Sequence, residues 1–365
     1  MHHLDGLRAI AVLGVVLCHT LDPERHPWSQ HGAYGVQLFF VLSGFLITGI
    51  LIDARRDAEQ VAQPMGGVLR SFYARRALRI FPVYYATLLV GALIGVEGMR
   101  ADLGWNLAYL SNWHVMSDGQ FGAVTHVWSL AVEEQFYLLW PFVVLFAPRR
   151  ALPWLIGFVI AAALTTRVIL TVATDMWSGG IAILTPSVLD SLGLGALLAF
   201  VWRESRGADR IVDGLGVLAI VLGLVDVAVG RWGLPRSGIA AVTEMWWSLA
   251  FVWLVHRVAR ERTGAFGRLL TLRPLAYLGT ISYGVYLFHL FVVPVATITE
   301  RHTRVNLPVP VERSPAQFVV VAVVSVAVAA ISWTAFERPI NSLKHRFPYV
   351  TIARGSRPAS ASSPV

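Results

Sequence analysis

The stretch LDGLRAIAVLGVVLCHTL, residues 4–21, is mostly apolar but carries Asp5, Arg8 and His19. A helix that crosses a bilayer needs about 20 mostly apolar residues, and this stretch is close to that length. Similar stretches recur along the chain, which predicts an all-α polytopic membrane protein. We expect about ten transmembrane helices, at residues 5–21, 34–52, 78–96, 126–147, 152–173, 181–202, 211–229, 237–256, 275–298 and 316–336.

The composition supports this class of protein. The chain has 365 residues, of which 56% are hydrophobic and only 14% are charged. Its mean hydropathy is +0.61. A soluble domain is nearer a quarter charged, so soluble enzymes, nucleic-acid-binding modules and disordered proteins are disfavoured. The single cysteine, Cys18, excludes an intrachain disulfide and a cysteine-based zinc site, and we expect no metal.

The basic residues predict how the chain is oriented. With the N-terminus inside, 21 basic residues fall in inner segments and seven in outer loops. Cytoplasmic loops carry the excess of Lys and Arg, so we expect both termini on the cytoplasmic side of a bacterial inner membrane. The net charge of +8 therefore indicates membrane orientation rather than nucleic-acid binding. We expect a transmembrane domain over residues 1–345 and a disordered Ser-, Ala- and Pro-rich tail over residues 346–365.

Two polar residues of the first span share one helix face. Arg8 and His19 are eleven residues apart, close to three full turns, and about 16 Å along the axis. Ionisable groups inside a span cost free energy and usually mark a function. This placement puts Arg8 near the inner surface and His19 toward the outer side. The alternative is that Arg8 reaches lipid phosphates and His19 is an interfacial residue.

Three arginines open the third span, in RSFYARRALRIFPVYY (residues 70–85). Arg76 and Arg79 share a helix face by their i,i+3 spacing, and Arg75 lies beside them. Guanidinium groups bind phosphates in a bidentate way, which makes these residues candidates for an anionic ligand. The alternative is that they only anchor the inner end of the span.

Two adjacent carboxylates lie inside the fourth span, in THVWSLAVEEQFYLLWP (residues 125–141). Glu133 and Glu134 point about 100° apart, so we expect at most one of them to face a given cavity directly. A buried acid is costly unless it pairs or lines water. We choose Glu133 as the functional one.

Other polar residues also fall in spans. Asp190 and Arg167 are buried charges that we expect to pair with each other. Ser282, Tyr286 and His289 lie at i, i+4 and i+7, on one helix face. They either line a polar cavity or make structural hydrogen bonds.

Taken in order, these motifs resemble the acyltransferase-3 family of bacterial integral membrane acyltransferases. The resemblance runs from LDGLRAIAV to FERPI and covers nearly the whole chain. The matching elements are Arg8 with His19, Phe39 to Ile47, Arg76 with Arg79 and Pro82, Trp128 to Tyr137, and Ile281 to His289. One departure is that no Arg precedes Asp190 between Pro186 and Leu189, which leaves Arg167 as its possible partner.

The resemblance implies an O-acyltransferase that moves an acyl group, often acetyl, from cytoplasmic acyl-CoA to a hydroxyl of a cell-envelope glycan or lipid-linked sugar. It implies that Arg75, Arg76 and Arg79 bind the coenzyme A phosphates, with Arg8 extending that site. His19 is then a general base oriented by Glu133 or, less favoured, Glu134, or an acylated relay. Two alternatives stay open: a macrolide or other metabolite as acceptor, and a secondary transporter. The sequence leaves the oligomeric state open.

Overall fold

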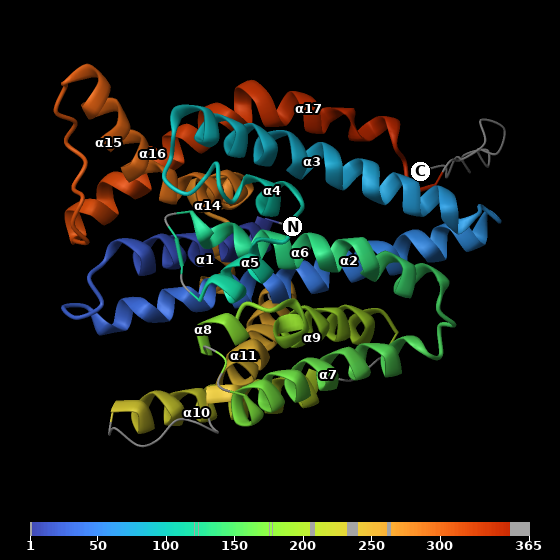
Figure 1. The fold of residues 1–365 in the computed structure, drawn as a ribbon. Helices are drawn as coiled ribbons and strands as arrows, with labels where there is room; N and C mark the ends of the chain where they lie inside the picture. Colours follow the sequence, from blue (N-terminus) through green and yellow to red (C-terminus); the bar gives the residue numbers. More distant parts are fainter. Residues whose placement is uncertain are drawn as a thin grey trace.

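The computed structural model describes residues 2–350 except 120, 123, 175, 177, 205–208, 232–239 and 261–263. Every regular element in this described part is helical, which confirms the all-α class (Figure 1). The long helices are α1 (His2–Thr20), α2 (Tyr34–Gln60), α3 (Met65–Ile94), α6 (Trp128–Phe146), α7 (Leu152–Ala173), α9 (Thr185–Glu204), α10 (Asp209–Arg231), α11 (Ala240–Arg260) and α16 (Pro315–Ser332).

Shorter helical segments connect and extend the long ones. Before α9 these are η1 (Pro27–Ala33), α4 (Leu103–Leu107), α5 (Ser111–Asp118), η2 (Thr125–Val127) and α8 (Ser178–Ile181). After α11 they are α12 (Ala265–Leu270), α13 (Arg273–Thr280), α14 (Ser282–Phe288), η3 (His289–Phe291), α15 (Val292–Thr303), the π-helical η4 (Trp333–Glu337), α17 (Arg338–Ser342) and η5 (Leu343–Arg346).

Eight helical stretches in the described residues are long and apolar enough to cross a membrane. They coincide with eight of the ten expected spans. The other two expected spans, 211–229 and 237–256, fall on α10 and α11, and the second begins in residues outside the described part. The chain is therefore a polytopic membrane protein.

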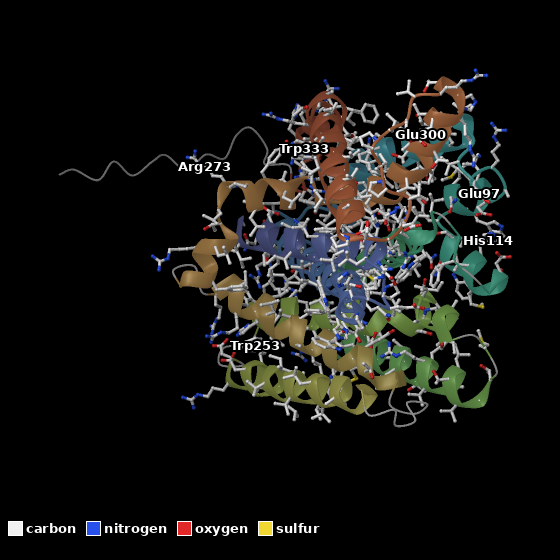
Figure 2. All side chains as sticks on the ribbon, turned by 90° about the vertical axis from the view of Figure 1, so that its left-hand side faces the viewer. Glu97, His114, Trp253, Arg273, Glu300 and Trp333 are labelled. Carbon is white, nitrogen blue, oxygen red and sulfur yellow. The ribbon has the colours of Figure 1, made fainter. Side chains whose placement is uncertain are left out.

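Helix α1 lies in the middle of the bundle (Figures 1 and 2). The C-terminal helices α15 to α17 lie on one side of it, and α7, α10 and α11 lie on the other. Its direct neighbours include α2, α13, α14 and α16. This central position brings Arg8 and His19 against side chains of other helices.

Glycines allow the closest helix crossings. A Cβ atom at Gly44 of α2 would collide with the backbone of Leu192 on α9, and one at Gly195 would collide with the backbone of Val41. Small residues permit such backbone approach between membrane helices. The FVLSGFLIT segment, residues 40–48, therefore packs α2 closely against α9.

The ninth expected span, 275–298, is not one continuous helix. It is divided into α13, α14, η3 and α15, and the chain changes from α-helix to 3₁₀-helix at His289. Gly279 of α13 allows a close approach to α1, because a Cβ atom there would collide with the backbone of Asp5. The broken helix thus runs directly alongside α1.

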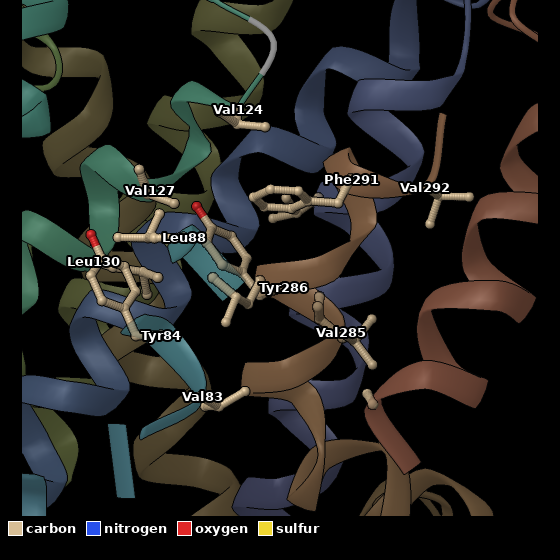
Figure 3. Packing of buried hydrophobic residues seen from close by; sticks show 14 of the residues in the cluster. Val83, Tyr84, Leu88, Val124, Val127, Leu130, Val285, Tyr286, Phe291 and Val292 are labelled. Atoms are coloured by element: carbon tan, nitrogen blue, oxygen red, sulfur yellow. The ribbon is translucent and has the colours of Figure 1, made fainter. Parts of the chain in front are cut away.

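Apolar packing holds the break in place. Tyr286 and Phe291, from the broken helix, face Val124 and Val127 around η2 and Leu130 in the first turn of α6 (Figure 3). These side chains belong to one buried cluster that also includes Tyr84 and Leu88 of α3 (Figure 3).

The described chain remains folded past residue 345. The backbone carbonyls of Phe347, Pro348 and Tyr349 accept hydrogen bonds from Arg75, Ser71 and Gln63 respectively. Residues 346–350 therefore pack against the N-terminal part of α3, although we expected the disordered tail to begin at residue 346. The rest of that expected tail, 351–365, lies outside the described residues.

Candidate active site

A polar cavity of about 90 Å³ lies at the centre of the bundle. Its charged residues come from three helices: Arg8 from α1, Arg76 and Arg79 from α3, and Glu133 and Glu134 from α6. Uncharged polar side chains complete the wall: Ser43, Ser129, Tyr137, Ser282, Tyr283 and Tyr286. Five helices that are far apart in sequence thus meet around one charged space.

The arginines of α3 divide between two environments. The Arg76 guanidinium lies over the ring of Tyr137, 3.9 Å from the ring centroid, and Arg79 follows it along the cavity wall. The Nε atom of Arg76 is buried and has no hydrogen-bond partner among the described residues. Arg75 does not line the cavity. Its guanidinium donates to the Phe347 carbonyl at 3.1 Å and lies over the Tyr349 ring, so Arg75 secures the chain after η5.

Both glutamates line the cavity, and the prediction that only one would do so is wrong. The cavity wraps around α6 from Ser129 to Tyr137, so side chains 100° apart both reach it. Glu133 is the more firmly held of the two, because its Oε1 accepts a hydrogen bond of 2.6 Å from Ser43 Oγ. The positive charges of Arg8 and Arg76 also act on Glu133.

His19 has a different partner from the one expected. Its Nδ1 lies 3.1 Å from Nε2 of His289, while the Oε1 atom of Glu133 is bonded to Ser43. The reason is the break at η3, which brings His289 against the C-terminal end of α1, where His19 lies. We expected Glu133 to orient His19, but the structure gives that position to an imidazole.

Tyr286 connects the histidines with the cavity. Its hydroxyl lies 2.6 Å from Ser129 Oγ, and both side chains line the cavity. Its backbone carbonyl bonds the Nδ1 atom of His289 at 2.6 Å. The polar face expected from Ser282, Tyr286 and His289 therefore divides, with the first two on the cavity and His289 beyond it.

Sequence reasoning missed several polar residues of this region. His126 is buried beside His289 with ring centroids 4.9 Å apart, and its Nε2 bonds the Leu287 carbonyl at 3.0 Å. Its position directly before an apolar span was an available signal. Tyr137, four residues after Glu133 and hence on its face, was another. Ser43 offered only its polarity within FVLSGFLIT.

Asp190 lies elsewhere in the bundle. Its carboxylate is paired with Arg167 at 2.6 Å, and Arg167 also reaches Glu244 at 3.3 Å. Asp190 is fully buried and Arg167 is 3% exposed. The pairing expected from the sequence is confirmed, and it replaces the arginine that is missing just before Asp190. This ion pair joins α7, α9 and α11 and does not line the cavity.

A metal has no evident place in the described part of the chain, where no group of three His, Cys, Asp or Glu residues is arranged to hold one. The groups positioned to act chemically are instead the cavity arginines and glutamates and the neighbouring imidazole pair. Three guanidinium groups facing one space are suited to a polyanionic ligand. A hydrogen-bonded imidazole beside them is suited to proton transfer.

Comparison with known proteins identifies the family of the chain. The model of a family described as an acyltransferase domain, acyltransferase-3, matches residues 1–334. The chain belongs to the acyltransferase-3 family. This match includes every charged residue of the cavity and both members of the imidazole pair.

Three relatives illustrate the similarity, and each match covers 93% of this chain. The peptidoglycan O-acetyltransferase OatA of Listeria monocytogenes is 28% identical over 55% of its length. The O-acetyltransferase OatA of Staphylococcus aureus is 28% identical over 57% of its length, and the putative peptidoglycan O-acetyltransferase YrhL of Bacillus subtilis is 29% identical over 54%. The chain thus spans about half the length of these relatives. No solved structure matches it.

Proposed function

We propose that this protein is a membrane O-acetyltransferase of the bacterial cytoplasmic membrane. In this proposal it transfers an acetyl group from acetyl-CoA to a hydroxyl of a cell-wall glycan. The observation that carries the proposal is a cavity lined by three arginines whose wall residue Tyr286 is hydrogen-bonded to His289, the partner of His19. The names of the relatives support the acetyl group and the glycan acceptor.

The arginines bind the donor in this account. Arg8, Arg76 and Arg79 line one cavity, and the phosphates of coenzyme A are the part of the donor that a guanidinium cluster recognises. Both termini are cytoplasmic in our proposal, which puts Arg8 and the start of α3 on the side where acetyl-CoA is available. Arg75 belongs to the contact with residues 346–350 and is left out of the donor site.

His19 acts on the acceptor. Imidazole is the side chain most often used for acid–base chemistry in enzymes. As a general base, it removes the proton of the acceptor hydroxyl while the oxygen attacks the thioester carbonyl carbon. The C–S bond breaks, the ester forms, and the imidazolium returns its proton to the thiolate, which leaves as coenzyme A.

The second route has His19 as an acyl carrier. An imidazole nitrogen attacks the thioester, coenzyme A leaves as the thiol, and the acceptor hydroxyl then takes the acetyl group from the imidazole. Arg8 and His19 are separated by about 16 Å along α1, so a donor held by its phosphates must extend its thioester arm toward the outer side in either route.

The test is a turnover assay with purified protein in detergent. Radiolabelled acetyl-CoA is incubated with isolated cell-wall glycan, and labelled ester and free thiol are both measured. The proposal expects the two products in equal amounts. If thiol is released and the label appears on a macrolide offered as acceptor, but not on the glycan, the acceptor is a metabolite and not a glycan. Thioester that stays intact with both acceptors would contradict an acyltransferase and favour a transporter.

A further inference from the structure

The hydrogen bonds of His289 determine which of its nitrogens carries hydrogen. Its Nδ1 lies 2.6 Å from the backbone carbonyl of Tyr286. A carbonyl oxygen only accepts hydrogen bonds, so Nδ1 must be the donor. A neutral imidazole has one N–H, and the Nε2 atom of His289 therefore presents a lone pair.

Burial favours the neutral ring. His289 is 1% exposed and has no ion-pair partner in the described part of the chain. Its nearest ring neighbour, His126, is itself bonded to a carbonyl and is fully buried. A cationic imidazole without an acidic partner at such a position is costly.

The tautomer of His289 determines the tautomer of His19. Nε2 of His289 lies 3.1 Å from Nδ1 of His19, and two lone pairs do not bond. His19 Nδ1 must therefore carry hydrogen and donate it. The Val15 carbonyl, one turn earlier on α1, is a second acceptor beside the same ring. The lone pair of His19 is consequently on Nε2.

The surroundings hold His289 rigidly. The Tyr286 hydroxyl bonds the His126 carbonyl at 2.9 Å, and His126 donates from Nε2 to the Leu287 carbonyl at 3.0 Å. These two bonds tie η2, directly before α6, to the last turn of α14, next to the 3₁₀ turn that carries His289. The His126 ring packs edge-on against His289 with an interplanar angle of 74°.

We infer that His289 is a positioning residue for His19. It fixes the tautomer and ring direction of His19, so that Nε2 is the atom that takes the acceptor proton or carries the acetyl group. After Nε2 takes up a proton, the Nδ1–H of the His19 imidazolium stays bonded to His289, as it would to a triad carboxylate. The chemical role of Nε2 rests on the proposed function, whereas the tautomer does not.

The tautomer is tested without turnover. The chain has 11 histidines, so ¹⁵N-histidine-labelled protein in detergent is compared with His19→Gln to assign the two ring nitrogens of His19 by difference. Our inference expects a protonated Nδ1 and an unprotonated Nε2. A protonated Nε2 in the unmodified protein would overturn it, whatever the enzyme assay shows. In His289→Ala we expect the Nδ1 signal to change, because its hydrogen-bond acceptor is gone.

The positioning role is tested by kinetics. His289→Ala should lower kcat by about ten- to a hundredfold and leave the KM for acetyl-CoA unchanged, because the donor site is separate. His289→Gln offers an amide oxygen as acceptor and should recover part of kcat. His302→Ala, which removes an exposed histidine on α15, is the matched control and should keep full activity. Unchanged kcat in His289→Ala would overturn the role, as would a Gln variant no better than Ala.

Discussion

The hydroxyl of Ser43 on α2 donates a 2.6 Å hydrogen bond to the Oε1 atom of Glu133 on α6, inside a cavity that also holds three arginines. This bond joins two helices that are 90 residues apart in sequence and leaves Glu133 without a contact to His19. We propose that Glu133 balances the positive charge that Arg76 and Arg8 bring to the cavity.

Charge and hydrogen bonding at Glu133 are separable. Glu133→Gln keeps an acceptor for Ser43 but removes the negative charge, and we expect kcat/KM for acetyl-CoA to fall by about ten- to a hundredfold. Ser43→Ala keeps the charge and loses one hydrogen bond, which costs about three- to tenfold. Steady-state kinetics of the two variants gives the order. A Ser43→Ala enzyme more impaired than Glu133→Gln would show that the hydrogen bond matters more than the charge.

The arginines of α3 should differ in their effect on donor use. Arg79→Ala should raise the KM for acetyl-CoA by more than tenfold, and Arg79→Lys should remain impaired because it keeps the charge but loses the planar fork. Arg75→Ala is the matched control from the same helix. Its guanidinium contacts residues 347 and 349 instead of the cavity, so its KM should stay unchanged. Equal effects at both positions would mean that these arginines serve only as anchors.

The orientation of the bundle can be measured in intact cells. In a Cys18→Ser background, Gln60→Cys at the end of α2 should resist an impermeant thiol reagent until the cells are opened. Trp28→Cys, in the segment between α1 and α2 and 56% exposed, should react at once. The excess of basic residues around α2 and α3 is the reason for this expectation. Labelling of position 60 in intact cells contradicts the proposed topology.

The ion pair of Arg167 with Asp190 should matter for stability rather than chemistry. Asp190→Ala removes the closer carboxylate of a buried guanidinium that also contacts Glu244 and the Ser187 carbonyl, and breaking a buried pair costs about 3–5 kcal/mol. Thermal unfolding in detergent should therefore shift to clearly lower temperature, while the folded fraction keeps its KM for acetyl-CoA. A stable Asp190→Ala protein with an altered KM would instead connect this pair to the donor site.

The sequence predicted some of these features because their signals are local. Hydropathy gives the spans, and helical spacing puts Arg8 and His19 on one face of the first span. The cost of a buried acid indicated that Glu133 faces a polar cavity, although both Glu133 and Glu134 line it. The pairing of Arg167 with Asp190 followed from the cost of leaving either charge alone.

The remaining features depend on tertiary structure. The contact of His289 with His19 joins positions 270 residues apart and depends on a helix break that hydropathy does not show. Arg75 and Arg76 are neighbours in sequence, yet only the packing of residues 346–350 separates their roles.

The proposed acetyl transfer depends most directly on His19. One measurement tests this role: acetyl transfer by His19→Gln, normalised to the amount of folded membrane protein. Gln keeps the approximate size and hydrogen bonding of the side chain but takes up no proton near neutral pH. We predict a loss of about 10²–10⁴ in rate if His19 is the base, and essentially complete loss if it carries the acyl group. A variant that transfers acetyl at the rate of the unmodified protein would contradict the account and return His19 to an interfacial role.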